Sequence, residues 1–168
     1  MPFIGIFAKE NDNNFIKNEI NKYAISNKYD VININLKSLE NLKNVKFDVL
    51  IIKENIIELL KRSNNIDKII NNSNYIIINT DINNDFIAEE KDNIITYGFN
   101  TNSDISISSI KDENILLCVK RKIKGIKEPI IEEQEVAINV RKHNINKLYN
   151  IMAIFTVLCL YGERLKNN

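Results

Sequence analysis

Residues 3–20 read FIGIFAKENDNNFIKNEI, and this stretch decides the class of fold. A short apolar run at residues 3–7 is followed by a polar turn and then by an amphipathic run that begins near Asn13. A buried strand that leads directly into a helix is typical of an α/β protein with a parallel sheet. The turn at residues 8–13 is the place where many such proteins hold a phosphate, but here it contains no glycine.

The same alternation continues through the first half of the chain. Further strands are expected at residues 31–35, 47–52 and 75–79. Helices are expected at residues 13–26, 54–62 and 66–70. Because the strands are nearly unbroken apolar runs, we expect a parallel sheet that is covered by helices on both faces.

The second half of the chain has a different pattern of apolar and polar residues. Strands are expected at residues 94–97, 105–110, 115–119 and 134–140, with a hairpin turn at residues 111–114. A last helix, at residues 145–163, is apolar on nearly all sides, which indicates a helix that is buried in the domain or covered by a partner. The expected fold class is α/β, with a mostly parallel sheet flanked by helices in the first half. The second half adds antiparallel strands and a long C-terminal helix, within a single domain over residues 1–168.

Composition limits the classes of function. The chain has 168 residues, of which 44% are hydrophobic and 27% charged, as in globular proteins. Its 23 basic and 22 acidic residues nearly balance, so no net charge favours nucleic acid or anionic lipid. With no apolar leader and no run long enough to span a bilayer, a cytoplasmic location is expected. The abundance of Ile, Asn and Lys is typical of a low-GC bacterium.

The turn after the first strand is a poor phosphate loop. A phosphate loop uses glycines so that backbone N–H groups can converge on the anion, together with a lysine that neutralises charge. Here Lys9 is the only cation, and Glu10 and Asp12 would face the same anion. Two like charges about 4 Å apart repel by roughly 4 kcal/mol at an effective dielectric constant of 20. Asp12 or Asn13 is instead expected to cap the helix that follows.

Other polar residues at the ends of the expected strands are less informative. A magnesium or calcium site built from carboxylates stays open as an alternative to solvated loops and helix caps. Its candidates are Glu10, Asp12, Glu54, Asp81 and Asp85. His143, the single histidine, is expected in an exposed turn, and Cys118 and Cys159 as buried, reduced thiols.

Three segments, in order, resemble the central domain of the Mur ligase family. ITYGFN at residues 95–100, followed by SDI at 103–105, resembles the family's "TYGF…AD" segment. NTD at 79–81 resembles the "N-x-D" that ends a strand there, and YNIMA at 149–153, running to LYG at 160–162, resembles the "YNALAA…LG" helix. The resemblance implies a domain that binds ATP and magnesium in ligases that form amide bonds through an acyl-phosphate.

The chain departs from this family at the positions that carry its chemistry. Residues 8–13 replace the "GTNGKT" loop, and KENI at 53–56 replaces the magnesium-associated segment. The family's His-Asn positions hold Asn146 and Lys147, because His143-Asn144 comes one helical turn too early. Neither flanking domain of the family is found in these residues.

We therefore interpret the chain as a non-catalytic Mur-ligase-like domain that acts as a binding or regulatory module, with no cofactor expected. Its partner would be a ligase, a cell-envelope or sporulation factor, or a second copy. The last helix is the best candidate for a contact surface, against the alternative that it is simply the centre of the domain. The residues of that surface are Ile154, Val157, Leu160 and Tyr161.

A rival interpretation is a ligase-like protein or subunit that still binds ATP and magnesium through altered residues. The residues that this rival needs are Lys9 on phosphate and Asn79, Asp81 and Asn150 on the base.

Overall fold

The computed structural model describes residues 2–23, 29–84, 92–126 and 130–163. Its elements are, in chain order, β1 (Phe3–Phe7), α1 (Glu10–Tyr23), β2 (Asp30–Asn33), α2 (Leu39–Leu42), β3 (Val49–Ile52), α3 (Ile56–Arg62), α4 (Asn65–Asn71), β4 (Tyr75–Asn79), β5 (Ile94–Tyr97), β6 (Ile105–Lys111), β7 (Asn114–Val119), β8 (Gln134–Asn139) and α5 (Ile145–Leu160). The strands form one 8-stranded sheet in the order β2-β1-β3-β4-β5-β6-β7-β8. Neighbours from β2 to β6 pair in parallel, and β6-β7 and β7-β8 pair antiparallel. The expected fold class is confirmed.

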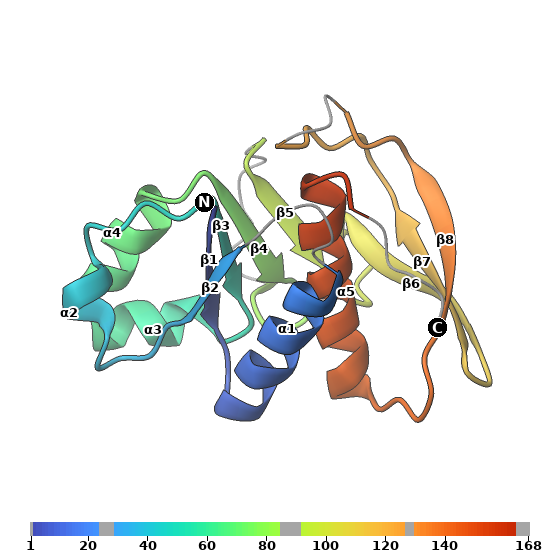
Figure 1. The fold of residues 1–168 in the computed structure, drawn as a ribbon, viewed down its shortest axis with the longest axis horizontal. Helices are drawn as coiled ribbons and strands as arrows, with labels where there is room; N and C mark the ends of the chain where they lie inside the picture. Colours follow the sequence, from blue (N-terminus) through green and yellow to red (C-terminus); the bar gives the residue numbers. More distant parts are fainter. Residues whose placement is uncertain (1, 24–28, 85–91, 127–129, 164–168) are drawn as a thin grey trace.

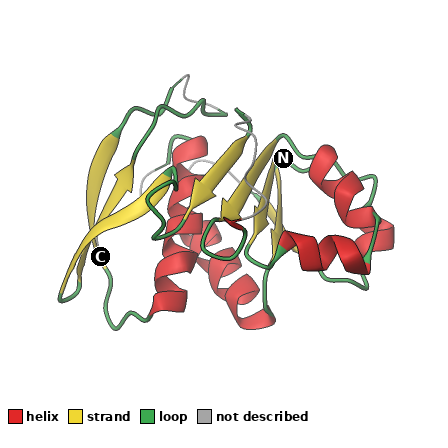
Figure 2. Ribbon diagram, turned by 180° about the vertical axis from the view of Figure 1, so that it is seen from behind, coloured by secondary structure: helices red, strands yellow, loops and turns green. Residues whose placement is uncertain are grey.

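Helices cover both faces of the parallel strands. Figure 1 shows α1 and α5 side by side on one face, with α2, α3 and α4 grouped on the other, and Figure 2 shows the same layers from behind. Each face has its own apolar core, one under α1 and α5 and one under the three short helices. Every residue of β3 is buried, because side chains on both faces of this strand are covered.

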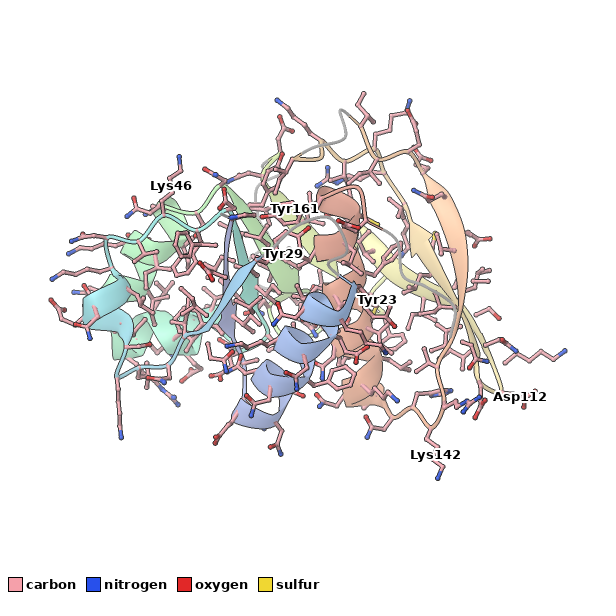
Figure 3. All side chains as sticks on the ribbon, viewed as in Figure 1. Tyr23, Tyr29, Lys46, Asp112, Lys142 and Tyr161 are labelled. Atoms are coloured by element: carbon pink, nitrogen blue, oxygen red, sulfur yellow. The ribbon has the colours of Figure 1, made fainter. Side chains whose placement is uncertain are left out.

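Helix α5 lies at the centre of the larger core, which corrects the expectation of a contact surface. Ile154, Val157, Leu160 and Tyr161 are at most 3% exposed. The sheet and α1 together enclose α5, and the ring of Tyr161 packs against Tyr29, with centroids 4.7 Å apart (Figure 3). The apolar character on nearly all sides of this helix reflects burial within one chain.

Two expected helix starts differ from the structure, by three residues for α1 and by two for α3. Helix α1 begins at Glu10, so Asp12 and Asn13 lie within its first turn and are buried, and neither is the N-cap. Its expected end falls in residues 24–28, outside the described part of the chain. Helix α3 begins at Ile56, where the side chain of Asn55 accepts a hydrogen bond from the N–H of Glu58 at 3.0 Å. Among the described helices, none has the length and apolar character needed to cross a membrane.

Candidate functional site

A crevice lies at the carboxyl ends of the parallel strands, between β1 and β3. The chain passes from β1 to β2 on one side and continues through β3 and β4 on the other. Ligands of open α/β sheets bind at such a point. Two cavities of about 540 and 430 Å³ open here, and Glu54, Leu59 and Arg62 line both. We take this crevice as the candidate site.

Beneath the crevice lies a buried ion pair that joins β3 to α1. Lys53 follows the last residue of β3, and its backbone N–H donates to the carbonyl of Phe7 at 2.8 Å, which extends the pairing of β1 with β3. The side chain of Lys53 is 5% exposed, and its Nζ lies 2.8 Å from Oδ2 of Asp12. Asp12 reaches this position because α1 begins early enough to include it.

Two asparagines on α5 complete the network. Asn146 and Asn150 are one helical turn apart, so their side chains lie on the same face of α5. Both Oδ1 atoms accept from Lys53 Nζ at 2.6 Å, and both Nδ2 groups donate to Oδ1 of Asp12, at 2.6 and 2.9 Å. The ammonium therefore uses all three of its N–H donors within the protein, and both oxygens of Asp12 are occupied.

The environment shifts the pKa of both charged groups. Burial alone would raise the pKa of Asp12, but the hydrogen bonds from Asn150, Lys53 and Asn146 outweigh it and hold the pKa below its usual value of 3.8. Burial lowers the pKa of Lys53, and the bond to Asp12 opposes this effect. We expect both groups to be charged near neutral pH, because each provides the hydrogen bonds that the other requires.

A second polar cluster lies where β4 and β5 end. The carboxylate of Asp81 accepts from the backbone N–H groups of Phe99 and Asn100 at 2.7 and 3.0 Å, and from the hydroxyl of Tyr149 at 2.9 Å. Burial and the bond to Asp81 raise the pKa of Tyr149 to about 12. This cluster fastens the loop after β5 to the end of β4 and to α5.

Gly98 is required for the close approach of these two strand ends. A Cβ atom at Gly98 would lie 2.5 Å from Oγ1 of Thr80 and 2.9 Å from Oδ2 of Asp81. The "TYGF" string thus has a packing role in this chain, whether or not it has any role in binding.

The residues of the rival nucleotide site lie in different surroundings. Lys9 is exposed at the rim of the larger cavity, whereas Asn150 belongs to the buried network. Asn79 is fully buried, and its Oδ1 accepts from the N–H of Asp81 at 2.9 Å. Lys9 thus borders the crevice and Asn150 lies buried beneath it, while Asn79 and Asp81 belong to the cluster at β4 and β5.

The single histidine and the strand-end carboxylates do not form a site among the described residues. Nε2 of His143, between β8 and α5, lies 2.9 Å from the carbonyl oxygen of Asp112 in the turn between β6 and β7. Within the described residues, no three or more His, Cys, Asp or Glu side chains gather closely enough to hold a metal ion, and Asp85 lies outside those residues. The carboxylate-lined alternative therefore gains no support from the described part of the chain.

Sequence reasoning missed Lys53 and Asn146 as members of a site. Two signals were present: a lysine directly after the apolar run at residues 47–52, and two asparagines four residues apart in an otherwise apolar helix. Neither signal identifies its partner, because Lys53 and Asn150 are 97 positions apart in sequence.

Comparison with known proteins supports the fold. No protein-family model matches the chain, and no curated protein matches it. A similar solved structure is MurF from Acinetobacter baumannii, a Mur ligase, with a TM-score of 0.50 and 10% sequence identity. The match covers 96% of this chain and 43% of MurF. The chain thus has a Mur-ligase-like α/β fold and spans less than half the length of that ligase.

Proposed function

We propose that this chain is a non-catalytic Mur-ligase-like domain that serves as a binding or regulatory module. The observation that carries the proposal is the state of Lys53. Its ammonium lies under the crevice, at the edge of the sheet where ligands of open α/β folds bind. Asp12, Asn146 and Asn150 accept hydrogen bonds from all three of its N–H donors.

Binding and activating a nucleotide triphosphate needs free N–H donors and cations aimed at the phosphates. In this crevice the buried cation already has a carboxylate partner, and the lining as a whole carries as many carboxylates, Asp12, Glu54 and Glu58, as cations, Lys9, Lys53 and Arg62. A phosphate within about 4 Å of one of these carboxylates meets a repulsion of roughly 4 kcal/mol at an effective dielectric constant of 20. The buried cation beneath the crevice is thus neutralised by the protein's own carboxylate.

The rival, a ligase-like protein that binds ATP and magnesium, requires large rearrangements. Asn150 would have to release Lys53 and Asp12 in order to contact a base. Asp81 already accepts from two backbone N–H groups and the hydroxyl of Tyr149, so a base would compete with these donors. Each broken hydrogen bond to a charged group costs about 1.5–3 kcal/mol, which the ligand would have to offset.

The test is thermal unfolding of the chain with and without millimolar ATP, ADP and magnesium. A ligand at 100 times its dissociation constant stabilises a protein by about 2.7 kcal/mol, which moves the midpoint of a domain of this size by several degrees. We expect no shift. A shift of that size that disappears in Lys9→Ala, but persists in the exposed control Lys61→Ala, would overturn the proposal in favour of the rival.

A further inference from the structure

Strand β8 forms one edge of the sheet, and among the described strands only β7 pairs with it (Figure 1). The N–H of Val140 donates to the carbonyl of Glu113, directly opposite, at 2.7 Å. In an antiparallel pair, residues alternate between bonding to the neighbouring strand and pointing away from it. The backbone N–H and C=O groups of Glu135, Ala137 and Asn139 therefore point outward from the sheet.

This edge lacks the features that usually block strand addition. Proteins protect exposed edges with lysines, prolines, bulges or very short strands. Strand β8 has six residues, contains no lysine or proline, and keeps an unbroken register with β7. The opposite edge, β2, has four residues, one of which is Asp30. The β8 edge is therefore the one available for pairing.

We propose that β8 pairs antiparallel with β8 of a second copy of this chain, about a two-fold axis that passes through Ala137. In this register Ala137 lies opposite its own copy, and Glu135 lies opposite Asn139 of the second copy. The backbone N–H and C=O groups of all three residues point outward. Each of these residues can therefore exchange hydrogen bonds with the residue opposite it in the second copy. The small side chain of Ala137 meets only itself at the axis.

The side chains next to this axis are self-complementary. Glu133, just before β8, comes opposite Arg141 of the second copy, just after its β8. Both residues are exposed, and neither side chain forms an ion pair or hydrogen bond with another described residue. By symmetry the pair occurs at both ends of the interface. Glu135 meets an amide rather than a like charge, so no repulsive pair arises.

A further contact supports the same register. Val136, which is half-buried in the single chain, comes opposite Ile138 of the second copy, so the apolar inner face of β8 continues across the axis.

The register is tested by charge reversal, with sedimentation of the full chain measured over a range of concentrations. The unaltered chain is expected to form a dimer. Glu133→Arg alone and Arg141→Glu alone should each weaken association about tenfold, because two exposed ion pairs become repulsive contacts. The double variant should return the dissociation constant to within about threefold of the starting value, because the pairs reform with opposite polarity. A monomer at all concentrations, or a double variant as weak as the singles, would overturn the proposal.

The backbone contact is tested by Ala137→Pro and by amide exchange. The outward N–H of Ala137 bonds to no described residue of the single chain, so proline should abolish dimerisation while the monomer keeps its thermal midpoint. Amide exchange at Glu135, Ala137 and Asn139 should slow as concentration rises, whereas exchange at the outward N–H of Val31, on the β2 edge, should not change. Concentration-independent exchange at these three amides would contradict the pairing. None of these results depends on nucleotide binding, so this inference and the proposed function can fail separately.

Discussion

Lys53 and Asp12 form an ion pair, with Nζ and Oδ2 2.8 Å apart, inside the domain and directly beneath the crevice between β1 and β3. The pair is held by Asn146 and Asn150 of α5, so a single network connects a strand, the first helix and the last helix. Burying two charges costs free energy, and the hydrogen bonds that Asn146 and Asn150 make to both charged groups offset that cost.

Lys53→Met should destabilise the chain by about 3–5 kcal/mol, because it leaves the carboxylate of Asp12 buried without its counter-charge. Urea unfolding followed by circular dichroism measures this change. Lys61→Met is the matched control: Lys61 pairs with Glu58 at 3.0 Å on the surface, where the loss should stay below about 1 kcal/mol. Equal effects of the two variants would show that the buried pair has no special role.

Adding Asp12→Asn to Lys53→Met should recover part of the lost stability. The second change removes the unpaired charge while keeping a side chain of similar shape that can hydrogen-bond to the asparagines. The double variant is expected to be more stable than Lys53→Met alone. A strictly additive loss would mean that Asp12 and Lys53 contribute independently.

Acid should weaken the fold through Asp12. Its pKa in the folded chain lies below the usual value of 3.8, so the unfolded chain takes up this proton first as the pH falls. The stability that Asp12 contributes is therefore fully present above about pH 4 and is lost as the pH drops through the folded pKa. This loss is measured by urea unfolding between pH 6 and 2, compared for the unaltered chain and Asp12→Asn. The free energy of unfolding of the variant should fall less steeply as the pH drops.

Leu160→Ala should cost about 2–5 kcal/mol, because it opens a cavity at a side chain that is fully buried. The control on the same helix is Ile145→Ala, at a position that is 61% exposed, where a change within about 0.5 kcal/mol is expected. The pair of changes Ile154→Asp and Leu160→Asp should leave the chain unfolded. If that double variant were a folded monomer, α5 would again be a candidate contact surface.

Gly98→Ala should destabilise the chain by more than about 1 kcal/mol, because the added methyl group would collide with Thr80 and Asp81 at the ends of β4 and β5. Ser109→Ala, on the exposed part of β6, serves as the control and should be nearly neutral. Thermal unfolding separates the two. If Gly98→Ala were neutral, the loop after β5 would have to be less tightly fastened than its hydrogen bonds indicate.

The sequence by itself determined the class of fold, because the signals that decide it are local. The apolar runs at residues 75–79 and 94–97 coincide with β4 and β5 to the residue, and the strand-helix alternation was enough to predict parallel pairing. The start of α1 was placed too late, because Asp12 and Asn13 look like caps when their neighbours in space are unknown.

Only the tertiary structure decided what α5 does and what lies under the crevice. A helix that is apolar on every side has the same pattern whether a partner or its own sheet covers it, and here the sheet and α1 cover it. The meeting of Lys53 with Asn150 requires the whole sheet to be assembled, since 97 positions separate them along the chain. Periodicity reports which side of an element is apolar, but the partner of a buried charge is set by long-range packing, which no local pattern encodes.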